Sequence, residues 1–187
     1  FAILVGYGYE YLTQNLKFSR IWQTGINILI FISLYLNLTQ ISLELVQRQT
    51  LDFIAGNQDR QGYLEHNLGW YARVMAELNT TYSNSKVLML YEPRGYECIP
   101  VCNPDEILDE WKISYLNGSD RDQILAEWRK TGYTHLLVNS QGIQFLRDYP
   151  DPHHPVTELD ALENLLETLP IENDYGGVYG LYKLTEN

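Results

Sequence analysis

A long run near the N-terminus of the chain carries no charge. Residues 21–43 contain no charged side chain, and Trp22 stands near the beginning of the run. At about 1.5 Å per residue, a helix of this length crosses the roughly 30 Å hydrocarbon layer of a bilayer. The run therefore predicts a transmembrane helix, and a helix buried in a soluble core is the alternative.

Residues 1–12 are also apolar and aromatic, and a short polar stretch with Lys17 and Arg20 separates them from the long run. We interpret residues 1–45 as a transmembrane helical hairpin, made of a helix cut through at its start (1–12) and a full span (21–43). The positive-inside rule assigns the turn with Lys17 and Arg20 to the cytoplasm and the rest of the chain to the outer side. Polar residues within a span indicate other transmembrane helices as partners; here they are Asn27, Asn37 and Gln40.

Residues 46–82 predict an amphipathic helical connector. Within residues 63–78, apolar side chains recur at spacings of four and three residues, which gives one apolar stripe along a helix. We interpret the stripe as packing surface; it consists of Leu64, Leu68, Tyr71, Met75 and Leu78.

Residues 83–187 alternate between short apolar runs and helical patterns. The runs at 86–91 and 134–139 predict buried strands, and the pair at 170–173 and 178–184 predicts a closing hairpin. The stretch with two prolines after the first strand is interpreted as a loop. Helical patterns fill the remainder, at 105–116, 121–130, 140–146 and 156–169. This order predicts an α/β fold: a small mixed sheet flanked by helices, with a C-terminal β-hairpin, preceded by the transmembrane helical hairpin.

Charge excludes some partners of this 187-residue chain. Its 24 acidic and 13 basic residues give a net charge of −11, and nearly all of it lies beyond the first 50 residues. An acidic surface repels phosphate backbones, so we expect no nucleic-acid partner. It also argues against attachment to anionic lipid by charge alone, which leaves contact with membrane lipid to the apolar span.

The loop after the first predicted strand contains the candidate ligand-binding residues Glu92, Arg94, Gly95 and Tyr96. Folds of this kind bind ligands at the C-terminal ends of their strands. Gly95 allows a tight turn, and the fork of donors on Arg94 suits a phosphate or a carboxylate. The alternative is an ion pair between Arg94 and Glu92 that only fastens the loop.

Cys98 and Cys102 follow in the same segment. They lack the second pair of ligands that a structural zinc site needs. Outside the cytoplasm they would form a small disulfide loop if Pro100 turns the chain enough to bring the sulfurs together, and free thiols are the alternative.

Other reactive side chains do not form a catalytic pattern. His153 and His154 are adjacent, a spacing that seldom directs both rings at one ion, and we interpret them as a solvated loop. Ser140 is predicted to cap a helix. We expect no metal, no cofactor and no catalytic residue in this chain.

Several segments together resemble the C-terminal end of bacterial multi-pass glycosyltransferases of the GT-C type, which are related to protein mannosyltransferases and to lipid A aminoarabinose transferases. The similarity extends from about residue 1 to residue 184. The segments that carry it, besides the charge-poor span, are 63–64, 68–72, 78–79, 87–96, 132–139 and 176–182.

The resemblance implies an enzyme that takes a sugar from a polyprenyl-phosphate carrier on the outer side of the bacterial cytoplasmic membrane. In such enzymes the catalytic acidic residue lies in the first external loop, which we expect this chain to lack. The soluble domain would then cap the active-site cavity or help bind the acceptor. Two alternatives remain open: a non-enzymatic membrane subunit with a protein-protein interaction module, and a soluble hydrolase or transferase, against which the missing catalytic pattern counts.

Overall fold

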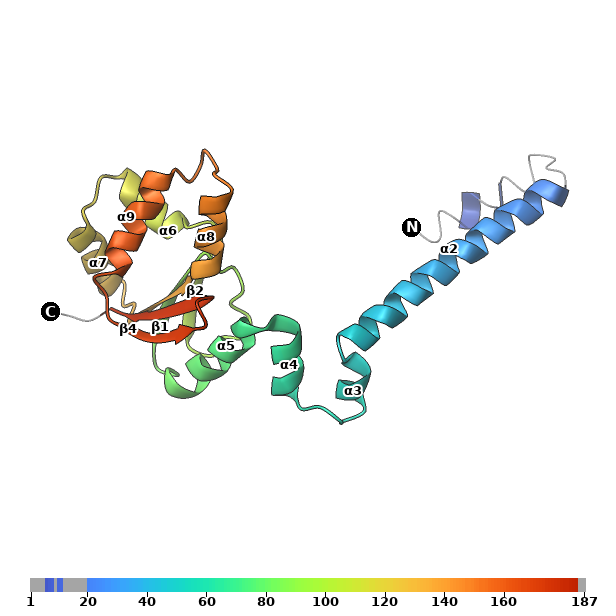
Figure 1. Cartoon of the computed structure of the whole chain (residues 1–187), viewed down its shortest axis with the longest axis horizontal. Helices are drawn as coiled ribbons and strands as arrows, with labels where there is room; N and C mark the ends of the chain where they lie inside the picture. Colours follow the sequence, from blue (N-terminus) through green and yellow to red (C-terminus); the bar gives the residue numbers. More distant parts are fainter. Residues whose placement is uncertain (1–5, 9, 12–19, 185–187) are drawn as a thin grey trace. The chain divides into compact units, whose positions relative to one another are not determined.

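A computed structural model describes the chain over residues 6–8, 10–11 and 20–184. The chain divides into two compact units, Phe1–Asp59 and Arg60–Asn187 (Figure 1). The first unit contains a long apolar helix, and the second is a layered α/β domain.

The predicted hairpin lies partly outside the described residues. Of its first helix, 1–12, the structure describes 6–8 and 10–11, and both pieces are helical. The polar turn at 13–19 lies outside the described residues. The hairpin as a whole therefore stays a prediction.

The first unit contains α2 (Arg20–Gln47) and the short α3 (Thr50–Ile54) (Figure 1). Within the described part of the chain, one helix is long and apolar enough to span a membrane. It covers the 27 residues Ile21–Gln47, and no residue in its most apolar stretch is buried. The apolar side chains of that stretch are exposed in the structure.

Polar side chains on α2 bond to their own helix. Asn37 Nδ2 donates to the carbonyl of Ser33 at 2.8 Å and Thr39 Oγ1 to that of Tyr35 at 2.9 Å, and Ser42 likewise donates four residues back, at 2.8 Å. An unsatisfied donor in hydrocarbon costs several kcal/mol, roughly, so this internal bonding lowers the cost of placing these groups in lipid. For Asn37, this bond uses one of the two N–H groups of its side-chain amide.

The second unit is built on a five-stranded sheet with the order β2-β1-β3-β5-β4. β1 pairs in parallel with β2 and β3, whereas β5 is antiparallel to both β3 and β4. The mixed sheet and its C-terminal hairpin confirm the predicted α/β fold. The strands are β1 (Lys86–Leu90), β2 (Val101–Asp105), β3 (His135–Asn139), β4 (Ile171–Tyr175) and β5 (Tyr179–Lys183).

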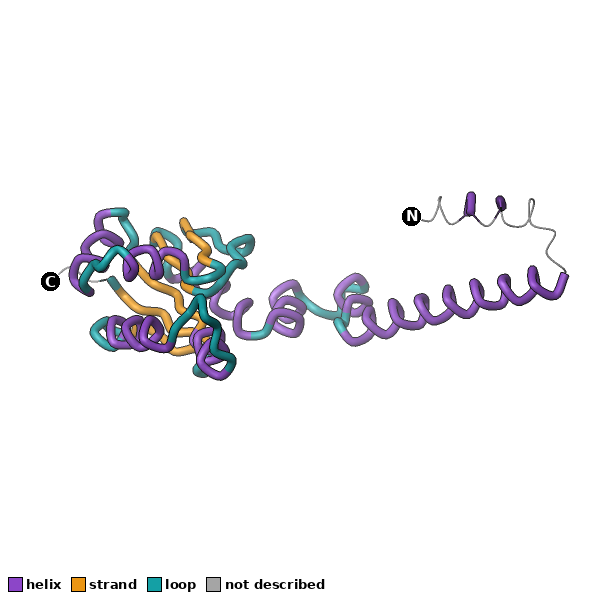
Figure 2. Tube along the Cα trace, turned by 90° about the horizontal axis from the view of Figure 1, so that it is seen from above, coloured by secondary structure: helices purple, strands orange, loops and turns teal. Residues whose placement is uncertain are grey.

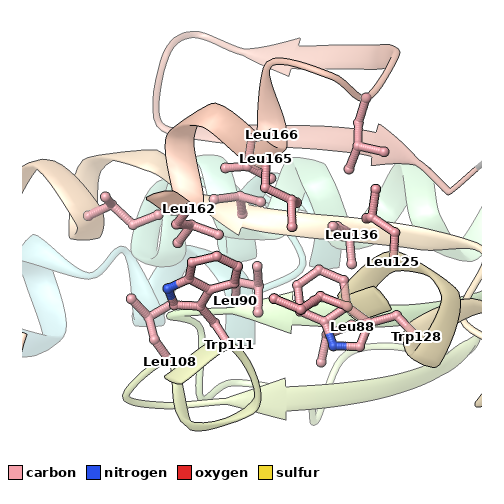
Figure 3. Close-up of a cluster of buried hydrophobic side chains, with 14 of the residues drawn as sticks. Leu88, Leu90, Leu108, Trp111, Leu125, Trp128, Leu136, Leu162, Leu165 and Leu166 are labelled. Carbon is pink, nitrogen blue, oxygen red and sulfur yellow. The ribbon is translucent and has the colours of Figure 1, made fainter. Parts of the chain in front are cut away.

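Helices cover both faces of this sheet (Figure 2). On β1, Val87 and Met89 point into a core shared with α5, whereas Leu88 and Leu90 point into the larger core on the other face. Figure 3 shows this larger core, in which the indoles of Trp111 and Trp128 lie among leucines. The helices are α4 (Arg60–Leu68) and α5 (Trp70–Thr81), followed by α6 (Asp109–Leu116), α7 (Arg121–Lys130), α8 (Ser140–Asp148) and α9 (Val156–Leu166).

Two local predictions are wrong. The last part of the proline-containing loop forms strand β2 at the edge of the sheet, where it pairs with β1, and its Asp105 also bridges to Glu92. An edge strand tolerates Pro104 because its missing N–H faces away from the ladder. The single helix predicted over 63–78 is interrupted at Gly69. The φ of Gly69 is 58°, which lies outside the right-handed helical region, so α4 and α5 are separate helices.

Candidate functional site

The loop after β1 is organised by a buried carboxylate. Glu92 is fully buried, and Arg94 contacts it through two side-chain bonds: Nε to Oε1 at 2.7 Å and Nη2 to Oε2 at 2.8 Å. The backbone N–H of Arg94 donates to the same Oε1 at 3.0 Å. A bidentate arginine–carboxylate pair of this kind is both strong and directional. Arg94 and Glu92 thus form the ion pair of the alternative interpretation.

Two tyrosines complete this cluster. The hydroxyl of Tyr179, on β5, donates to Glu92 Oε2 at 2.5 Å and accepts from Arg94 Nη2 at 2.7 Å. The guanidinium carbon of Arg94 lies 4.2 Å from the ring centroid of Tyr71, on α5, whose hydroxyl donates to the Arg94 carbonyl at 2.6 Å. The loop is therefore fastened to α5 and to β5.

The electrostatics of the cluster favour the charged pair. Burial raises the pKa of the Glu92 carboxyl, but hydrogen bonds from Arg94 and Tyr179 outweigh it, so this pKa lies below its usual value. The bond to Glu92 raises the pKa of Arg94. Burial, and then the neighbouring Glu92, raises the pKa of Tyr179, while burial raises that of Tyr71 to about 12. Both phenols are therefore protonated at neutral pH.

A cavity of about 250 Å³ lies beside Arg94. It lies at the C-terminal ends of β1 and β3. Along the chain, β1 is followed by β2, its neighbour on one side in the sheet, and then by β3, its neighbour on the other side. Such a reversal of strand order is the place where α/β sheets bind ligands. The cavity is lined by Leu68, Trp70, Tyr71, Arg94, Asn139, Gln141, Val178 and Tyr179.

Asn139 is held in place by the beginning of α8. Its Oδ1 accepts a hydrogen bond from the N–H of Gly142 at 2.9 Å, so Asn139 caps the helix and the cap predicted at Ser140 is wrong. The ring of Tyr91 lies directly over Gly142, where a Cβ would stand 2.2 Å from it. Tyr91 itself adopts a φ of 57°, which ends β1 and turns its ring towards α8.

Gly95 and Tyr96, two further residues of the predicted ligand site, do not line the cavity. Gly95 packs against Pro104 of β2, so close that a Cβ would meet the proline ring at 2.8 Å. Tyr96 is exposed, and its ring centroid lies 5.9 Å from that of Tyr71. Gly95 and Tyr96 shape the loop, and of the predicted set only Arg94 reaches the cavity.

Cys98 and Cys102 are joined as a disulfide in the structure, with Cα atoms 6.2 Å apart. Cys102 lies in β2, whereas Cys98 lies in the loop that carries Arg94. The bond closes this loop onto the edge strand.

The two adjacent histidines do not share one environment. His154 is buried and its Nδ1 lies 3.5 Å from Oε1 of the buried Glu158, so the prediction of a solvated loop is wrong for this residue. The backbone carbonyl of His153 accepts a bond from Lys112 Nζ. Among the residues that the structure describes, no group of three or more His, Cys, Asp or Glu side chains could hold a metal ion.

Sequence reasoning missed most of the cavity lining. The sequence pattern around Trp70, Tyr71 and Tyr179 is typical of packing residues. Their position beside Arg94 depends on how the sheet and its helices are ordered in space. Asn139 gave the clearest available signal, because a polar residue at the end of a buried strand lies at the ligand-binding edge of such folds. Comparison with protein-family models, with curated proteins and with solved structures finds no match to this chain.

Proposed function

We propose that this chain is the membrane-anchored C-terminal region of a GT-C-type glycosyltransferase that uses a polyprenyl-phosphate sugar. Its α/β domain lies on the outer side of the bacterial cytoplasmic membrane, where the cavity beside Arg94 helps to bind the sugar acceptor. The proposal depends above all on α2, a helix long and apolar enough to cross a membrane.

The cavity supports an accessory role in binding rather than catalysis. Glu92, the carboxylate paired with Arg94 beside the cavity, is buried and is also bonded to Tyr179. Its lowered pKa leaves no proton to donate at neutral pH. Aromatic and amide side chains around a small cavity suit the recognition of a sugar ring.

Membrane integration is the first test. We expect the expressed chain to remain in the membrane pellet after carbonate extraction and to leave it only with detergent. The variant Phe31→Lys/Leu34→Lys is the matched control, because each charge near the helix centre costs about 2.5–3.5 kcal/mol on insertion scales. In intact spheroplasts, an impermeant amine reagent should label the exposed Lys130 on α7. Release of the unaltered chain by carbonate alone would refute the anchor.

Sugar transfer is the second test. Membranes containing the complete protein should transfer labelled hexose from polyprenyl phosphate to acceptor, and removal of residues 60–187 should lower transfer at least roughly tenfold, since a lost binding contribution of about 1.4 kcal/mol has that effect. A variant truncated after residue 184 is the control for altered expression. No transfer by the complete protein would reject the glycosyltransferase.

A non-enzymatic membrane subunit is the second candidate, and the surface of α6 favours it. Ile113 and Leu116 are 61% and 70% exposed on this one short helix. If α6 is a contact for another protein, Ile113→Asp/Leu116→Asp should dissolve a defined complex in native gels while the complete protein shows no sugar transfer.

A further inference from the structure

Several side chains that line the cavity beside Arg94 offer hydrogen-bond donors. Arg94 uses Nε and Nη2 for Glu92 and Tyr179, which leaves its Nη1 amine for a ligand. Asn139 uses Oδ1 as the helix cap, which leaves its amide Nδ2. The lining contains one guanidinium, two side-chain amides and no carboxylate. Such a lining suits a ligand rich in acceptor oxygens.

Neither of the two tyrosines that line the cavity has a hydroxyl proton free for a ligand. Tyr71 donates its proton to the Arg94 carbonyl and Tyr179 donates its proton to Glu92. Trp70 adds a third aromatic side chain, and the guanidinium carbon of Arg73 lies 4.9 Å from its ring centroid.

Two guanidinium groups lie near this cavity, and each is paired with a carboxylate. Arg94 bonds to the buried Glu92, and Arg73, whose guanidinium carbon lies 4.9 Å from the Trp70 ring centroid, bonds to Glu65. The donors that Arg94 and Asn139 leave unused suit an anionic group rich in acceptor oxygens, and the aromatic side chains suit an attached ring.

We propose that this cavity binds a monosaccharide that carries an anionic group, either a carboxylate or a phosphate. This deepens the proposed function by naming the ligand class of the same cavity. Its volume of about 250 Å³ suits one sugar unit, since cavities for larger ligands occupy about 300–1,000 Å³. The anionic group bonds to Arg94 Nη1 and Asn139 Nδ2, and the ring lies against the aromatic walls.

The test uses the full chain in detergent micelles and isothermal titration with four probes: glucuronate, glucose 1-phosphate, glucose and inorganic phosphate. We expect glucuronate or glucose 1-phosphate to bind, and glucose and inorganic phosphate to bind roughly tenfold more weakly, since a hydrogen bond to a charged group contributes about 1.5–3 kcal/mol. Equal binding of glucose, or of phosphate alone, would overturn the proposal, as would failure of all four probes.

Asn139→Asp is the decisive variant. An Asp side chain caps a helix as well as Asn does, so α8 keeps its cap, but the amide donors become a carboxylate that repels the ligand. Affinity for the anionic sugar should fall at least roughly tenfold while the circular dichroism spectrum and melting temperature stay unchanged. Asn164→Asp makes the same charge change on α9, which contributes no residue to the cavity, and should leave binding intact.

Equal binding by wild type and Asn139→Asp would refute the assigned contacts. Binding is measured without membrane insertion or sugar transfer. A chain that binds glucuronate but transfers no sugar would therefore reject the proposed function alone, whereas a transferase that binds none of the probes would reject the ligand class alone.

Discussion

Arg94→Ala is expected to destabilise the α/β domain by about 3 kcal/mol, the lower end of the range for breaking a buried ion pair. The variant leaves the carboxylate of Glu92, whose side chain is 1% exposed, without its bidentate partner. The Arg94 side chain is 37% exposed, so water can partly replace it, which places the loss at the lower end. Urea denaturation of the full chain in micelles, followed by tryptophan fluorescence, measures the change.

The sign of the effect can be checked with a second substitution. Glu92→Gln in the Arg94→Ala background replaces a stranded charge with a neutral amide, so the double variant should be more stable than Arg94→Ala alone at neutral pH. Arg94→Lys should lie between wild type and Arg94→Ala, because lysine keeps the charge but cannot form the bidentate bond. A double variant less stable than the single one would show that the pair is not the origin of the loss.

The same variant should show a distinct pH dependence. In the wild type, the pKa of Glu92 lies below its unfolded value of 4.5, so its contribution is complete above pH 4.5 and is lost as the pH falls through the lowered pKa. Without Arg94, burial raises this pKa above the unfolded value, and stability then increases as the carboxyl takes up a proton. The difference between wild type and variant should therefore shrink as the pH falls.

Gly142→Ala is expected to destabilise the domain by about 1–3 kcal/mol, the usual cost of overpacking. The new Cβ would stand 2.2 and 2.6 Å from two ring carbons of Tyr91 and 3.2 Å from Asn139 Cγ, so the ring must leave its position. In an open helix the same substitution would stabilise by about 0.5–1 kcal/mol. The sign thus depends on Tyr91, and chemical denaturation of the full chain measures it.

Tyr91→Gly provides the matched rescue. It removes the ring over Gly142 and also relieves the φ of 57° that Tyr91 adopts. In this background, Gly142→Ala should become neutral or stabilising, which gives a strongly non-additive double-mutant cycle. Gly25→Ala in α2, where a Cβ would meet nothing within 4 Å, is the control for the substitution itself. Additive effects of Tyr91→Gly and Gly142→Ala would exclude the proposed contact.

The sequence alone was sufficient for the features that depend on local pattern. A charge-free run of this length predicted α2, and short apolar runs predicted β1, β3 and β5, because side-chain periodicity follows backbone geometry. It failed at β2, whose sequence VCNPD carries no strand pattern. β2 forms because an edge position needs pairing on only one side and tolerates proline.

The candidate site was predicted only in part, for a related reason. Position after a strand singled out Arg94 and Glu92, since strand ends in α/β folds face ligands. Nothing in the spacing connects Arg94 with Tyr179, 85 residues later in the chain, or with Asn139 at the end of β3. These neighbours follow from the sheet order β2-β1-β3-β5-β4, which a single sequence does not reveal.

The amino-acid sequence by itself therefore determined that the chain has an apolar helix followed by an acidic α/β domain, because hydrophobic period and charge act over a few residues. Only the tertiary structure decided which residues share the cavity, whether Arg94 is paired or free, and why Gly142 is a glycine. Each of these depends on which segments the packed sheet brings into contact, and such contacts join positions that are far apart along the chain.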